Sequence, residues 1–248
     1  MGGWEVIEGR ELLFEIEREH WWFESRRKIV YDLFWKKYFS KQTEKLKILS
    51  IGTSSGVELE FLSKFGNVLG IDLDEKMVLN AQKNGLNVLK QDILSNNFKD
   101  NSFDIVFAMD VLEHIEDHEK AFKEAFRVLR SGGYMFITVP ACKFLWSNHD
   151  EHQFFPHKRR YNKKDFLVLL RTQNVEILKC SFFNFFLFPF ITLVRLLNVS
   201  SDSQLKIPNK FVNSFFKTIF SSERYFLNKI NFPIGVSLIA ICRKKCAE

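Results

Sequence analysis

Residues 46–56 constrain the fold most, because they predict a buried strand, a tight loop and the first turn of a helix in immediate succession. The strand half is short and apolar, with Leu46, Ile48, Leu49 and Ile51. Gly52 and Gly56 bracket the loop, and glycine lets a ligand approach the main chain closely. The free amides at the helix start can then hydrogen-bond a polar ligand. An ordinary strand-to-helix turn is the alternative.

The next ninety residues repeat this alternation of strand and helix. Apolar runs predict strands at 67–74, 87–90, 102–110 and 134–139, and periodic patterns predict helices at 57–65, 75–83 and 116–129. We expect the glycines at 132 and 133 to end the last of these helices as a C-cap turn. Such alternation favours a parallel sheet with right-handed crossovers. Further on we expect a helix at 162–171, strands at 175–181 and 235–242, and a helix near 209–228.

Two segments do not belong to a minimal domain of this class. Residues 10–39 have a helical pattern that contains the pair Trp21 and Trp22, which either anchor this helix or form a lid over a ligand. Residues 182–197 are strongly apolar, but they contain Asn184, Pro189 and Arg195 and are too short to span a bilayer. We therefore expect an N-terminal helical cap (1–45), an α/β core (46–182), an apolar and basic helical insertion (183–232) and a last strand with its tail (233–248).

Composition narrows the setting and the partners. The 248 residues include four cysteines without metal-ligand spacing, and no signal peptide is evident, which favours a reduced, cytoplasmic protein. Residues 203–248 carry eight basic and two acidic side chains, an excess equal to the net charge of +6. A basic end is compatible with an anionic membrane surface, although a solvated face is the usual explanation. No nucleic acid is expected, because the basic residues do not form a known recognition motif.

Acidic residues follow the second and third predicted strands. Asp72 ends the second strand twenty residues after Gly52, where a carboxylate can accept both hydroxyls of a ribose. A helix N-cap is the alternative for Asp72, but Asp74 fills that role equally well. Asp92 follows the third strand at the same edge of the sheet, where a plain turn acid remains the alternative.

Taken together, these motifs resemble a class I S-adenosylmethionine-dependent methyltransferase over about residues 46–161. The resemblance is carried by the loop from Gly52 to Gly56 and by the segments Gly70-Ile-Asp72, Gln91-Asp92-Ile93, 103–115 and 128–133. The His-Trp-Trp-Phe at 20–23, with the segment 146–161, further resembles a bacterial and archaeal subgroup of uncertain substrate. The resemblance implies a Rossmann-like, seven-stranded, mostly parallel sheet with an antiparallel last strand and helices on both faces.

The resemblance also implies which residues bind S-adenosyl-L-methionine. The loop with Gly52, Thr53, Ser54 and Gly56 would face its methionine part, and Asp72, followed by Leu73, would hold the ribose. Asp92 and Ile93 would flank adenine, Met109 would lie near the sulfonium, and Trp22 and Arg26 would cover the site from the cap. The loop departs from the family pattern twice, with Ser50 in place of an acid and Ser54 in place of a glycine. Cofactor binding is then expected either to be weaker than is typical of the family or to be completed by Asp110 or the cap, and Ser54→Gly is expected to tighten it.

Histidines and carboxylates near the ends of the fourth and fifth strands are candidates for acid–base chemistry. A hydroxyl acceptor needs its proton removed, and His114, His149 and Asp150 are the expected catalytic residues, with His152 and His157 as further candidates. A structural histidine bonded to the backbone is the alternative for each. No metal is expected, although Asp110, Glu113 and His114 would share one face of a helix that began there and resemble the acid-x-x-Glu-His of quinone O-methyltransferases.

The resulting functional hypothesis is methyl transfer to a small or amphiphilic acceptor, most simply at oxygen. N- or C-methylation, or a non-catalytic module that binds the cofactor or its demethylated product, are the alternatives. The aromatic insertion predicts either peripheral association with a membrane surface or a homodimer interface, and the two are ranked equally. A NAD-binding enzyme is the rival on fold, but its G-x-G-x-x-G spacing is absent.

Overall fold

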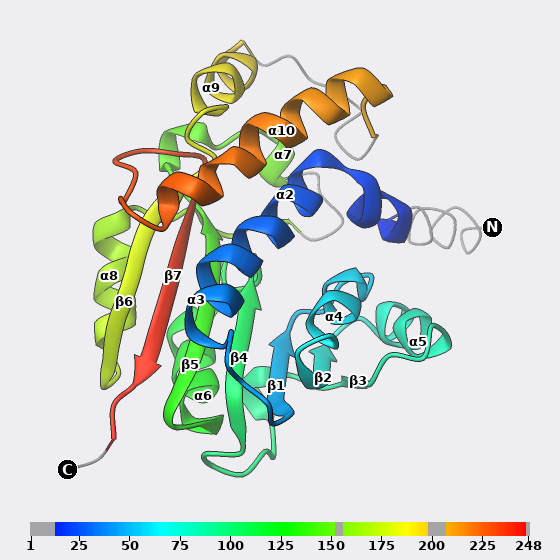
Figure 1. Ribbon diagram of the computed structural model, residues 1–248, viewed down its shortest axis with the longest axis vertical. Helices are drawn as coiled ribbons and strands as arrows, with labels where there is room; N and C mark the ends of the chain where they lie inside the picture. The colour runs from blue at the N-terminus through cyan, green and yellow to red at the C-terminus, as the bar shows by residue number, and fades with distance from the viewer. Residues whose placement is uncertain (1–12, 152–155, 198–206, 247–248) are drawn as a thin grey trace.

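The core of the molecule is a seven-stranded sheet (Figure 1), seen in a computed structural model that describes residues 13–151, 156–197 and 207–246. The strand order is β3-β2-β1-β4-β5-β7-β6, and β7 runs antiparallel to β5 and β6 while the other pairs are parallel. This confirms the predicted α/β class and its antiparallel last strand. The strands are β1 (Leu46–Ile51), β2 (Gly66–Asp72), β3 (Val88–Lys90), β4 (Phe103–Met109), β5 (Leu129–Pro140), β6 (Val175–Phe183) and β7 (Ser237–Lys244).

Helices connect the strands and pack around the sheet (Figure 1). They begin where the sequence supplies a cap: the Asp74 carboxylate accepts from the amides of Lys76 and Met77, and the Asp117 carboxylate accepts from Lys120. The connecting helices are α4 (Val57–Leu62), α5 (Glu75–Lys83), α6 (His118–Val128), α7 (Asn148–Glu151) and α8 (Lys163–Arg171), with short 3₁₀ turns η2 (Ile93–Ser95) and η3 (Lys143–Leu145).

Two local predictions were wrong. Gly132 and Gly133 do not end a helix, because α6 stops at Val128 and β5 already starts at Leu129. The glycines lie inside a register irregularity between β4 and β5, and a Cβ at Gly133 would come within 2.8 Å of the Asp104 carbonyl oxygen. The segment after β4 is also not helical, because α6 begins only at His118, so residues 111–117 form a turn.

The N-terminal cap consists of a helical segment at 13–19 followed by one long, locally π-helical rod: α2 (Trp21–Val30), η1 (Tyr31–Trp35) and α3 (Lys36–Tyr38). Phe34 packs its ring against Phe107 of β4 and Phe136 of β5, and this contact fixes the rod to the sheet. The rod starts with α2 at the carboxyl ends of the parallel strands and runs along the sheet toward their amino ends (Figure 1).

The insertion before β7 contains α9 (Phe188–Leu196) and α10 (Lys210–Leu227). α10 packs along α2 through hydrogen bonds from the Trp21 amide to the Asn213 side chain and from the Ser25 hydroxyl to the Lys217 carbonyl. We call α2 and α10 together the roof, because they lie across the sheet end where β4 and β5 finish (Figure 1). Among the described residues, no helix is long and apolar enough to cross a membrane.

Candidate functional site

A large cavity of about 1280 Å³ lies between the carboxyl ends of the strands and the roof. Its wall combines the loop after β1, the ends of β2 and β4, the cap and the insertion. Ligand pockets usually measure roughly 300–1,000 Å³. This cavity is therefore large enough for two ligands side by side, and its two ends differ in chemistry.

One end, which we call the nucleotide end, is built on the loop after β1. Gly52 has φ +70°, and a Cβ there would lie 2.5 Å from Cγ2 of Val111, so only glycine fits. The Ser54 amide donates to Oδ2 of Asp72 at 3.0 Å, and the Asp74 amide donates to Oδ1 at 2.9 Å. Burial raises the pKa of Asp72, although both hydrogen bonds act to lower it. The acid of the second strand thus lies directly against the loop of the first.

Most other residues predicted for the cofactor line the same end, namely Thr53, Leu73, Asp92, Ile93 and Met109. The Asp92 carboxylate also accepts from the Leu94 amide and so caps η2, as expected for a turn acid. Asp92 nevertheless lines the cavity. Gly56 does not line the cavity. It is the N-cap of α4 with φ +92°, and it shapes the loop instead.

The cap reaches into the cavity between its two ends. The Arg26 guanidinium forms ion pairs with Asp110 and with Glu58, at 3.2 Å for the latter. These charges raise the pKa of Arg26 although burial opposes them. Trp22 lines the wall as well, and its ring stacks on Phe220 of α10 at 5.0 Å. The tryptophan pair therefore serves both alternatives, as an anchor to α10 and as part of the cover.

The other end, which we call the histidine end, centres on His157. Its Nδ1 lies 2.7 Å from Oδ1 of Asp150, and Asp150 is fully buried and also bound by Arg160 at 2.8 Å and Arg195 at 3.1 Å. Burial alone would raise the pKa of Asp150, but the hydrogen bond from His157 and the two arginines outweigh it and hold the pKa below its usual range. An ionised Asp150 can only accept, so Nδ1 of His157 carries the proton and Nε2 has a free lone pair.

Glu113 and His114 face His157 from the turn after β4. Nε2 of His157 lies 3.9 Å from Oε1 of Glu113, and the rings of His114 and His157 are 4.9 Å apart. Neither carboxylate oxygen of Glu113 has a hydrogen-bond partner among the described residues, and burial, followed by the charge of Asp110, raises the pKa of Glu113 well above its usual value. Nδ1 of His114 lies 3.0 Å from the Pro156 carbonyl, to which it donates, and burial lowers the pKa of His114.

These three side chains are also the ones that could hold a divalent cation. Glu113, His114 and His157 each offer a ligand atom, and the three atoms lie within 4.8 Å of one another. The set differs from the predicted trio, because Asp110 is ion-paired to Arg26 and the turn does not place it with the histidines. The side chain of His149 and all of His152 lie outside the described residues.

The similarity to known proteins lies in the core of the chain. A family model described as a methyltransferase domain matches residues 49–137, the segment that supplies β1 to β5 and the nucleotide end. The core of the chain, residues 49–137, therefore resembles S-adenosylmethionine-dependent methyltransferases.

Two curated relatives illustrate the range of this methyltransferase family. A sterol 24-C-methyltransferase from Aspergillus fumigatus is 35% identical over 100 residues, which cover 36% of this chain and 26% of the relative. A ubiquinone biosynthesis O-methyltransferase from Pelagibacter ubique is 31% identical over 105 residues, 40% of this chain and 44% of the relative. The aligned part thus spans less than half of either relative.

A solved S-adenosylmethionine-dependent methyltransferase from Mesorhizobium loti shares the fold, with a TM-score of 0.56 at 16% identity over 82% of this chain and 93% of that one. The nucleotide end also fits S-adenosylmethionine on its own geometry. Asp72 can hold ribose hydroxyls beside a loop that tolerates close approach, and the Thr53 hydroxyl is buried without a partner among the described residues.

Sequence patterns missed several residues of this cavity, and three of them come from the cap and the insertion. Glu17, Asn184 and Arg195 all line the cavity, and each comes from a segment outside the recognised core. Asn184 is fully buried with φ +56°, and neither atom of its amide has a partner in the described part of the chain. A short polar residue inside an apolar run was the available signal for Asn184, but it does not reveal where the side chain points.

Proposed function

We propose that this methyltransferase methylates a hydroxyl oxygen of an amphiphilic acceptor and that His157 removes the hydroxyl proton. The observation that carries the proposal is the arrangement of one cavity, with the cofactor residues at one end and the His157–Asp150 pair at the other. Methyl transfer is an in-line displacement, so much of the rate can come from holding two ligands in contact inside one enclosure.

When bound, S-adenosylmethionine supplies a methyl carbon that the acceptor oxygen attacks, while the electron pair of the breaking C–S bond stays on sulfur. His157 is suited to take the released proton, because Asp150 fixes the imidazole with Nε2 unprotonated. Glu113, 3.9 Å away, is a second acceptor for that proton. Asp150, predicted as catalytic, is buried away from the cavity wall, and we propose that it positions His157. His114 lines the wall and remains a proposed base.

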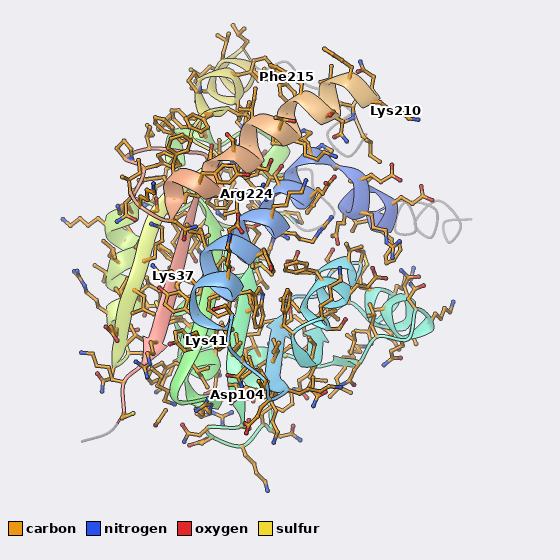
Figure 2. The ribbon with its side chains drawn as sticks, viewed as in Figure 1. Lys37, Lys41, Asp104, Lys210, Phe215 and Arg224 are labelled. Atoms are coloured by element: carbon orange, nitrogen blue, oxygen red, sulfur yellow. The ribbon has the colours of Figure 1, made fainter. Side chains whose placement is uncertain are left out.

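The acceptor class follows from the surface next to the histidine end. Ile191 and Arg195 of α9 line the cavity, yet none of the nine residues of α9 is buried. Large apolar side chains of α9, α10 and their flanks are exposed together: Phe186, Phe190, Leu193, Leu196, Leu197, Phe211, Phe215, Tyr225, Phe226 and Ile230. Figure 2 places Phe215 on α10 at this end of the molecule. A lipid surface that covers this apolar face would deliver a lipid-like acceptor beside the cavity.

Charge contributes less to such docking than the sequence suggests. Lys217 pairs with Glu24 at 2.9 Å and Arg224 with Asp32 at 3.4 Å, so acids of the cap neutralise part of the basic excess of α10. We therefore expect the apolar side chains to carry most of the membrane affinity, and salt to weaken it only modestly.

The test has a chemical and a physical arm. The protein is incubated with methyl-labelled cofactor and a lipid extract, and a labelled product that mass spectrometry identifies as a methyl ether supports the proposal. Cofactor binding without transfer would favour the non-catalytic module, and methylated amine or carbon products would overturn O-methylation. In the second arm, co-sedimentation with vesicles of anionic and neutral phospholipids is expected for the wild type and lost in Phe211→Ser/Phe215→Ser. A dimer in size-exclusion chromatography that the same variant dissociates, with no sedimentation, would assign the face to a second copy instead.

A further inference from the structure

The loop after β1 is held from an unexpected direction. Ser54 and Ser55 both donate their hydroxyl hydrogens to the carboxylate of Glu17, to Oε1 at 2.7 Å from Ser54 and to Oε2 from Ser55. Glu17 belongs to the helical segment 13–19 of the cap, is only 7% exposed and lines the cavity. The loop itself lacks the acid that the family pattern has at the position of Ser50. A carboxylate is therefore present at the loop, but the cap supplies it.

The surrounding charges leave this wall negative. Glu17 lies near Arg26, but the guanidinium of Arg26 already forms ion pairs with Glu58 and Asp110. Three carboxylates thus surround the Arg26 guanidinium, and Arg27 also lies near Glu17 and Glu58, so carboxylates still outnumber guanidinium groups at this wall. Burial raises the pKa of Glu17 even though both serines stabilise its ionised form. A cationic ligand group beside Glu17 would favour the ionised form that burial disfavours.

The backbone of the loop gives a second indication. Ser54 adopts φ +46°, a left-handed backbone conformation that residues other than glycine, asparagine and aspartate rarely adopt. The hydrogen bond from Ser54 to Glu17 offsets this cost. The serine that departs from the family pattern is thus the residue that attaches the loop to the cap.

We propose that Glu17 replaces the missing loop acid and binds the ammonium group of the cofactor's methionine part, so that the N-terminal cap is a component of the cofactor site. The proposal rests on the cofactor assignment under the proposed function. A carboxylate oxygen has two lone pairs, so each oxygen can accept from an ammonium as well as from a serine. Against the expectation from sequence, Ser54→Gly should then weaken cofactor binding, because it removes the contact that positions Glu17.

The experiment is calorimetric titration of the full chain with S-adenosylhomocysteine, S-adenosylmethionine and a deaminated analogue of S-adenosylhomocysteine. Glu17→Gln should weaken binding of the two amino-bearing ligands alike, by about tenfold or more. Binding of the deaminated analogue should change little, because it has no ammonium for Glu17 to hold. Glu15→Gln, an exposed acid on the same helical segment, should leave all three affinities unchanged.

Several outcomes would overturn the proposal. Equal losses for the amino and deaminated ligands would mean that Glu17 only supports the loop, and a loss confined to S-adenosylmethionine would mean that it acts on the sulfonium charge. If Glu17→Gln does not fold by circular dichroism, the wild-type preference for the amino ligand and its decrease in Ser54→Ala decide the question, and no preference overturns the proposal. A wild type that binds none of the ligands would overturn the proposed function itself, whereas tight wild-type binding unaffected by Glu17→Gln overturns only this inference.

Discussion

The nucleotide end and the histidine end of the cavity differ in how their polar groups are satisfied. At the nucleotide end, the Asp72 carboxylate accepts two backbone amides and Asp92 accepts a third. At the histidine end, Glu113 and Asn184 are completely buried and their side chains have no hydrogen-bond partner among the described residues. Buried polar groups are normally paired, so those at the histidine end are expected to find partners in a ligand or in water. The nucleotide end thus holds its two acids on backbone amides and leaves the Thr53 hydroxyl for a ligand, whereas the histidine end leaves a whole carboxylate and a whole side-chain amide to be satisfied on binding.

The substitution His157→Asn should have the largest effect, because it should change the function of the histidine end and leave that of the nucleotide end intact. Loss of the base should lower the rate of methyl transfer by about 10²- to 10⁴-fold, while cofactor affinity stays within about twofold because His157 does not contact the loop after β1. Single-turnover rates and calorimetry measure the two quantities. His118→Asn is the matched control, because His118 lies outside the cavity wall. A parallel loss of cofactor affinity would show that the two ends are not independent.

The second test concerns the support of the histidine end. Glu223 of α10 is fully buried, and its carboxylate accepts the amides of Asn184 at 2.7 Å and Phe186 at 2.9 Å. Burial raises the pKa of Glu223 from 4.5 to about 7. The folded state therefore keeps a proton that the unfolded chain releases, and this contribution to stability is full below pH 4.5 and is lost as the pH rises through about 7.

We expect Glu223 to make the free energy of unfolding fall by roughly 3 kcal/mol between pH 4.5 and 7. Glu223→Gln should remove that part of the pH dependence, measured by urea unfolding at several pH values. Glu119→Gln, at an exposed position of α6, should leave it in place. An unchanged slope in Glu223→Gln would contradict the assignment.

The smallest expected effect is that of Asn184→Gly. Because the side-chain amide of Asn184 has no partner among the described residues and the φ of +56° suits glycine, we expect the free energy of unfolding to change by less than about 1 kcal/mol. The KM for the acceptor should rise by up to about tenfold, since a neutral hydrogen bond contributes about 0.5–1.5 kcal/mol. Asn101→Gly, at an exposed residue with φ +57°, is the control for the backbone effect. Unchanged KM with lost stability would make Asn184 a purely structural residue.

The same contrast explains how far the sequence could predict the molecule. Buried apolar runs define β1 and β4, and the carboxyl ends of parallel strands meet, so Gly52, Asp72 and Asp92 could be placed together without coordinates. The early start of β5 was missed because an irregular register absorbs Gly132 and Gly133 inside a strand. Sequence spacing could not show that His157 faces Glu113, because that contact depends on how the segment after residue 155 crosses the turn after β4.

That crossing is itself a specific arrangement. The Lys158 amide donates to the Glu113 carbonyl at 2.9 Å, and the guanidinium of Arg159 donates to the carbonyls of Leu112, Ile115 and Glu116. The resemblance in sequence identified both segments, the turn after β4 and the segment after residue 155, but it did not indicate that they are in contact. Their meeting is a tertiary contact between residues more than forty positions apart, for which no local propensity exists.

The roof of α2 and α10 has a consequence for the order of events in turnover. The cap that carries Glu17 and Arg26 closes over the nucleotide end, and the insertion that carries Asn184 and Arg195 closes the histidine end. Since Trp21 and Ser25 attach α2 directly to α10, we expect the two covers to move together. Both compartments would then open and close together, so that both ligands bind before closure and both products leave only after reopening.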